Sequence, residues 1–146
     1  MTQEQFDYAD LLLPHNYLGR AHDFYAASRM LPNFHPGFMP MWPQLALFGL
    51  AIELVLKGFL LSKGETAEKL KKSYGHNLQK LHSQSIELGL PENPRSERMI
   101  SFINDTYAIH MPRHPDPQTR HRPVATVPQF FEDYDRLVQS VTEMIA

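Results

Sequence analysis

The sequence contains no cysteine and carries little net charge, and each of these features excludes a class of protein. Without cysteine there are no disulfides, no thiolate metal ligands and no cysteine nucleophile. The formal charge of −2 over 146 residues gives no overall basic balance of the kind that attracts nucleic acid, although a local patch still could. The first residues lack a basic region followed by an apolar core, so we expect no secretory signal and a cytoplasmic protein.

The sequence also lacks the alternation of apolar and polar residues that is typical of β-strands. Apolar residues spaced three and four apart, the pattern of helices, recur along the chain instead. The longest apolar run, residues 45–61, is rich in Leu, Ala and Phe and predicts a buried central helix. Its two charges, Glu53 and Lys57, lie near the middle and argue against a membrane span. Their spacing suits a helical ion pair. They form either an ordinary salt bridge or a pair that holds a functional neighbour in place.

The other helical segments predict one all-α domain over residues 1–146. Helices are expected at 15–30, 45–61, 77–88, 96–110 and 128–145, which makes a bundle of about five helices. Residues 65–74 predict either a short helix or a mobile connection. Residues 1–13 form an acidic N-terminal lead, and the proline-rich residues 112–128 predict an exposed loop.

Residues 31–43 carry four prolines, which exclude a regular element, yet the segment is strongly apolar. Such a loop packs over the core of its own domain or over a partner. We therefore predict a two-fold homodimer, because such dimers are the commonest oligomers. The expected interface residues are Phe34, Phe38, Met41 and Trp42.

Three pieces of the chain together resemble the HEPN family. They are the run from Ala51 to Lys57 (AIELVLK), the run from Gly75 to Leu81 (GHNLQKL), and Tyr107 followed by Arg113-His-Pro115. The resemblance implies an up-and-down helical bundle, usually a homodimer. Many members of that family are metal-independent ribonucleases that use an Arg and a His brought together from two subunits. Other members serve as toxin-associated partners or nucleotide-binding modules.

The resemblance places a candidate catalytic site at Arg113 with His114 or His121. A His can take the 2′-hydroxyl proton and an Arg can hold the phosphate. Seven residues separate Arg113 from His121, one more than the family pattern allows, and Pro115 and Pro117 interrupt the segment. The same loop predicts a phosphate-binding patch at Arg113, Arg120 and Arg122. The supporting residues are Glu53, Lys57, His76 and Tyr107. Because the motifs of the family occur together, as if they meet in space, the resemblance also predicts that Glu53 or Lys57 contacts Arg113 or His76.

The histidines of this loop also raise the question of a metal site. His110, His114 and His121 lie near Asp105 and Asp116 in the sequence, but Pro112 prevents the first two from sharing one helix face. We therefore expect exposed loop histidines, no metal and no cofactor.

Two functions from different classes follow from these observations. The first is a HEPN-like dimeric binding or regulatory module that takes a nucleotide or RNA, in a toxin–antitoxin or defence system. Its partner would be a cognate antitoxin or a nucleotidyltransferase-type protein. The alternative is a metal-independent ribonuclease that uses Arg113 with His114 or His121.

Overall fold

The computed structural model describes residues 13–31, 42–110 and 127–145, and these contain helices and no strand. This confirms the predicted all-α bundle with about five long helices. The long helices are α2 (Pro14–Met30), α3 (Trp42–Ser62), α5 (Leu78–Glu87), α6 (Pro94–His110) and α7 (Val127–Ile145). Between α3 and α5 lie the short α4 (Ala67–Lys69) and the π-helical η1 (Leu70–Tyr74).

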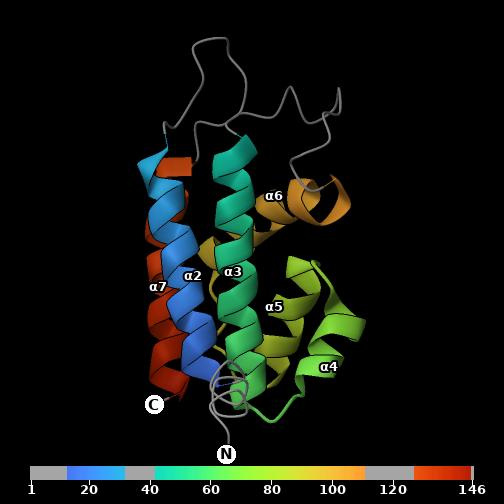
Figure 1. The fold of residues 1–146 in the computed structure, drawn as a ribbon. Helices are drawn as coiled ribbons and strands as arrows, with labels where there is room; N and C mark the ends of the chain where they lie inside the picture. Colours follow the sequence, from blue (N-terminus) through green and yellow to red (C-terminus); the bar gives the residue numbers. More distant parts are fainter. Residues whose placement is uncertain (1–12, 32–41, 111–126, 146) are drawn as a thin grey trace, which may run out of the picture.

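Helix α3 is the centre of the bundle, as its composition predicts. Helices α2, α3 and α7 run lengthwise beside one another, and α2 and α3 are antiparallel (Figure 1). The segment from α4 to α5 lies on the other side of α3 from α2 (Figure 1). Phe48, Ile52, Leu56 and Leu60 of α3 are fully buried. Among the described helices only α3 is long and apolar enough to cross a membrane, and 61% of that span is buried in the bundle.

An aromatic cluster joins α2, α3 and α7. The rings of Tyr25 and Tyr134 stack with their centroids 4.2 Å apart, and the rings of Phe48 and Phe131 meet edge to face at 5.6 Å. The Tyr25 hydroxyl also donates a hydrogen bond to the carbonyl of Phe131, at 3.2 Å. Aromatic pairs in these geometries contribute beyond the area that they bury. The cluster therefore fixes α2 and α7 against the central helix.

Helix α2 lies close to α3 because α3 has a glycine at the contact. A Cβ added to Gly58 would lie 3.0 Å from the Cβ of Tyr17 and 3.2 Å from the carbonyl oxygen of Pro14. Any larger residue at position 58 would therefore push the start of α2 away. This contact sets the position of the first turns of α2 relative to α3.

Two predicted boundaries differ from the structure. Helix α3 begins at Trp42, inside residues 31–43 that were predicted to hold no regular element, because Pro43 falls in the first helical turn, where proline is tolerated. Helix α6 begins at Pro94 rather than at Ser96, because proline is tolerated in the first helical turn and Asn93 accepts a hydrogen bond from Arg95 N at 2.9 Å. Residues 67–74, predicted as a short helix or a connection, are helical. Thr66 caps their start by accepting from Lys69 N at 3.1 Å.

Candidate functional site

The Glu53 carboxylate links the central helix to the segment that precedes α5. Its Oε2 lies 3.2 Å from Lys57 Nζ, and its Oε1 lies 2.7 Å from His76 Nδ1. The predicted contact between the Glu53–Lys57 pair and His76 is therefore confirmed. Glu53 is only 5% exposed, so the ion pair does not lie on a solvent-exposed face of the helix. The side chain of His76, in contrast, is 54% exposed.

Backbone geometry and capping place His76 opposite Glu53. Gly75 adopts a positive φ of 52°, which suits glycine, and ends η1. Asn77 then caps α5 by accepting from Lys80 N at 3.1 Å. In addition, Leu78 N donates to the buried Oδ1 of Asn104 on α6, at 2.7 Å. The capping role thus belongs to Asn77, and His76 anchors this segment to α3.

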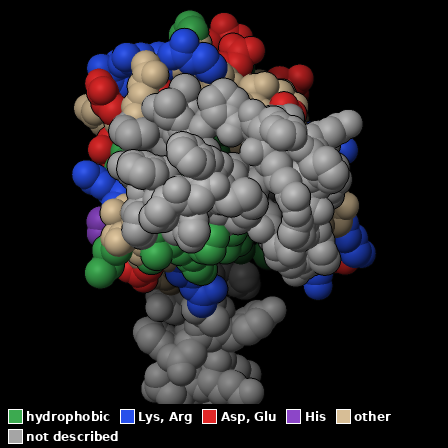
Figure 2. Space-filling model, turned by 90° about the horizontal axis from the view of Figure 1, so that it is seen from above, with side chains coloured by type: hydrophobic (Ala, Val, Ile, Leu, Met, Phe, Trp, Pro, Cys, Tyr) green, Lys and Arg blue, Asp and Glu red, His purple; other side chains and the backbone are tan. Residues whose placement is uncertain are grey.

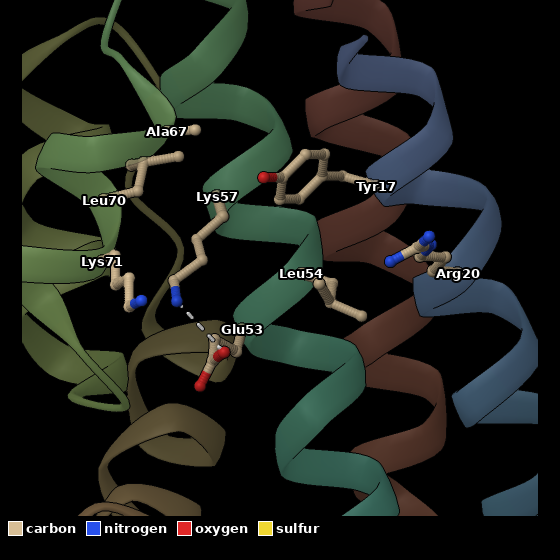
Figure 3. Close-up of a pocket in the computed structure, with 8 residues that line it drawn as sticks. All are labelled: Tyr17, Arg20, Glu53, Leu54, Lys57, Ala67, Leu70 and Lys71. Atoms are coloured by element: carbon tan, nitrogen blue, oxygen red, sulfur yellow. Dashed lines mark hydrogen bonds and ion pairs between the residues drawn. The ribbon is translucent and has the colours of Figure 1, made fainter. Parts of the chain in front are cut away.

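A pocket of about 320 Å³ opens between α2, α3 and the α4–η1 segment. Figure 3 shows that Tyr17 and Arg20 reach it from α2, and that Glu53, Leu54 and Lys57 reach it from α3. Ala67, Leu70 and Lys71 complete its wall from α4 and η1. The volume falls within the range of roughly 300–1,000 Å³ that is typical of small-molecule pockets.

Three cations from three different elements line this pocket. They are Arg20 on α2, Lys57 on α3 and Lys71 on η1. Lys57 pairs with Glu53, and its side chain is only 14% exposed. Arg20 and Lys71 form no ion pair with any residue in the described part of the chain. The pocket therefore carries a net positive charge, which favours an anionic ligand.

The charged residues around Lys71 pair with one another and not with Lys71, which lines the pocket. Lys72 pairs with Glu68 at 2.6 Å, and Lys69 pairs with Glu65 at 3.2 Å. Glu65 also accepts from the Tyr74 hydroxyl at 3.1 Å and so ties the start of this segment to its end. The segment contains a π-helical turn, a form that is rare in proteins and is frequently found at functional sites.

A second pocket, of about 460 Å³, has the opposite charge. Glu92 and Glu97 line it, with His82 and Ile100 nearby. Burial lowers the pKa of His82, and the carboxylates of Glu97 and Glu92 oppose that shift. Within residues 13–31, 42–110 and 127–145 no group of three or more His, Asp or Glu side chains is arranged to hold a metal ion.

The remaining predicted site residues lie outside the described residues. They include the candidate catalytic residues Arg113, His114 and His121 and the phosphate-binding candidates Arg120 and Arg122. The side chain of Tyr107, near the end of α6, also lies outside, as do the interface candidates Phe34, Phe38, Met41 and Trp42. The hypotheses that depend on these side chains stay predictions.

The pocket contains residues that sequence reasoning did not select. Tyr17 and Arg20 are three apart on α2 and therefore share a face, but nothing in their pattern distinguishes that face from a solvated one. The glycine at position 58 was the available signal, because it permits the close approach that brings this face of α2 to α3. Lys71 was hidden in a segment that was predicted to be either helical or a connection.

Comparisons with protein-family models, with curated proteins and with solved structures found no match for this chain. The function therefore has to be argued from the geometry of the pocket, with the HEPN resemblance as an expectation beside it.

Proposed function

We propose that this protein is a binding or regulatory module whose ligand is a small phosphorylated molecule of the nucleotide class. The ligand is held in the pocket between α2, α3 and η1. One observation carries the proposal: Arg20, Lys57 and Lys71 converge on a single pocket, and Arg20 and Lys71 form no ion pair within the described residues.

The lining of the pocket suits the two parts of such a ligand. Ammonium and guanidinium groups bind phosphate through charge-assisted hydrogen bonds. The buried Glu53 orients Lys57 through their 3.2 Å contact, so that one cation is already positioned before a ligand arrives. Leu54, Leu70 and the ring of Tyr17 add apolar surface for a sugar or base. The pocket thus combines phosphate-binding cations with a surface for an organic group.

A nucleotide fits the described surface better than an RNA strand does. A strand is held by a positively charged groove that follows its backbone. At the rim of the end where α2 ends and α3 begins, the side chains that Figure 2 colours include Lys and Arg beside Asp and Glu. Three cations, Arg20, Lys57 and Lys71, instead meet in one pocket of limited volume.

On the basis of the HEPN resemblance, the proposal also includes an oligomeric state and a partner protein. The module would form a homodimer through the apolar residues 34–42 and would act with a cognate antitoxin or a nucleotidyltransferase-type partner in the cytoplasm. Sedimentation at tens of micromolar protein tests the dimer, and a monomer at that concentration would count against it.

The binding proposal is tested by calorimetric titration with adenosine 5′-monophosphate and adenosine 5′-diphosphate. We expect saturable binding that weakens about tenfold in Lys71→Gln, because a charge-assisted contact to phosphate is lost. The matched control is Lys72→Gln, since Lys72 neighbours Lys71 but pairs with Glu68 and does not line the pocket. Affinity should also fall as salt rises from about 50 to about 200 mM.

Two results would contradict the proposal. The first is that neither nucleotide binds saturably. The second is that Lys71→Gln and Lys72→Gln weaken nucleotide binding equally. Incubation with mixed RNA tests the alternative function. RNA cleavage that persists in chelator but disappears in Arg113→Ala and His121→Ala would support the metal-independent ribonuclease instead.

A further inference from the structure

The cations of the pocket lie at two ends rather than at one. Figure 3 shows α3 in the centre, with α2 on one side of it and the α4–η1 segment on the other. Arg20 belongs to α2, whereas Lys71 belongs to η1, so the two lie on opposite sides of α3. Leu54 of α3 lies between Arg20 and the Glu53–Lys57 pair (Figure 3).

Each end of the pocket carries one net positive charge. At the η1 end, the positive charge of Lys57 is offset by its partner Glu53, which leaves the charge of Lys71. At the α2 end, Arg20 supplies one positive charge with no ion pair in the described part of the chain. Each end therefore offers one uncompensated cation, and the surface between them is formed by Leu54 and Tyr17.

We propose that the preferred ligand carries two separated phosphate groups, as a nucleoside 3′,5′-bisphosphate does. One phosphate binds at Lys57 and Lys71 and the other binds at Arg20, while the nucleoside lies over Leu54 and Tyr17. This inference rests on the proposed function, since it concerns the same pocket. It adds that the spacing of the two phosphates, and not only the total charge, determines affinity.

The geometry distinguishes this ligand from a nucleotide with contiguous phosphates. In a 5′-diphosphate both charged groups are on the same side of the sugar, so they meet the cations of one end and leave the other end unused. In a 3′,5′-bisphosphate the sugar separates the two groups, and each can contact its own cation. Fixed separation of two cations is therefore a basis for selecting between ligands of similar charge.

The experiment compares three probes by calorimetric titration of the full chain. They are adenosine 5′-monophosphate, adenosine 5′-diphosphate and adenosine 3′,5′-bisphosphate. We expect the bisphosphate to bind about tenfold more tightly than either of the others, because it gains a second charge-assisted contact. Arg20→Gln should remove this advantage, so that the bisphosphate then binds the variant about as tightly as the monophosphate does. The control Arg98→Gln, on α6 and outside the pocket, should leave all three affinities unchanged.

The possible failures are distinguishable. If none of the three probes binds, the proposed function itself is wrong. If the diphosphate binds as tightly as the bisphosphate, or if Arg20→Gln weakens all three probes equally, the pocket binds nucleotides but does not read the spacing of two phosphates. Circular dichroism should show that the Arg20→Gln variant is folded. We expect this result because Arg20 is exposed.

Discussion

The two sides of helix α3 are held together by different kinds of contact. On the side of α2 and α7, the rings of Tyr25, Phe48, Phe131 and Tyr134 pack against one another. On the side of η1, α5 and α6, the buried core residues are aliphatic, among them Leu70, Leu78 and Ile100, and hydrogen bonds at Glu53 and Asn104 add to that packing. Ring packing depends on shape and volume, whereas the polar contacts depend on individual atoms. The pocket depends on both sides, because α2 contributes Tyr17 and Arg20 and η1 contributes Lys71.

The largest expected effect comes from removing a ring on the aromatic side. Phe48 is fully buried, so Phe48→Ala leaves a cavity and should lower the free energy of unfolding by about 3–5 kcal/mol. Phe48→Leu, which keeps most of the volume, should cost clearly less. Urea unfolding measures both, and a loss below about 1 kcal/mol for Phe48→Ala would show that the cluster is not tightly packed.

On the polar side we expect a smaller loss from one carboxylate. Glu53→Gln leaves Lys57 without its buried partner and weakens the contact with His76, which should cost about 1–3 kcal/mol. The matched control is Glu68→Gln, whose pair with Lys72 is exposed and should contribute at most about 0.5 kcal/mol. Equal losses for the two variants would remove the distinction between a buried connection and a surface ion pair.

The contact between the helix backbones gives a third test. At Gly58, alanine gains helix propensity but brings its Cβ to 3.0 Å from that of Tyr17, so Gly58→Ala should lose about 1 kcal/mol net. Gly19→Ala is the control, because nothing lies within 4 Å of the added atom, and it should stabilise by up to about 1 kcal/mol. Thermal unfolding separates them, and stabilisation by Gly58→Ala would show that α2 moves freely on α3.

The smallest effect at neutral pH concerns the tyrosines of the aromatic cluster. Burial raises the pKa of Tyr25 to about 12, and Asp135 adds to that rise. Burial also raises the pKa of Tyr134. In the unfolded chain both ionise near pH 10, so their contribution to stability is present below about pH 10 and is lost as pH rises toward about 12.

Ultraviolet titration of the tyrosines checks this expectation. Tyr25 and Tyr134 should ionise only well above pH 10 in the folded protein and near pH 10 in denaturant. Burial and the hydrogen bond to Glu65 also raise the pKa of Tyr74, so its ionisation should be delayed as well. Ionisation of all tyrosines near pH 10 without unfolding would mean that the cluster is open to water.

The sequence was sufficient to predict the long helices of the fold and one contact of the candidate site. The length and composition of the apolar run predicted α3, and the co-occurrence of the HEPN-like motifs led us to expect the contact with His76, which the structure contains. Arg20 and Lys71 were not predicted as pocket residues. Their convergence depends on how closely α2 approaches α3 and on the helical register of residues 67–74, and neither follows from local periodicity.

The π-helical turn at Leu70–Tyr74 makes the length of this segment as important as its composition. A π turn holds more residues than an α turn, so deleting one residue would let the chain return to ordinary α-helical geometry. Each residue of an α-helix turns the chain by about 100°. A deletion would therefore rotate Lys71 relative to Gly75 and the start of α5. A gain or loss of a single residue between Lys71 and Gly75 would change where Lys71 lies in the pocket without altering any side chain of the pocket.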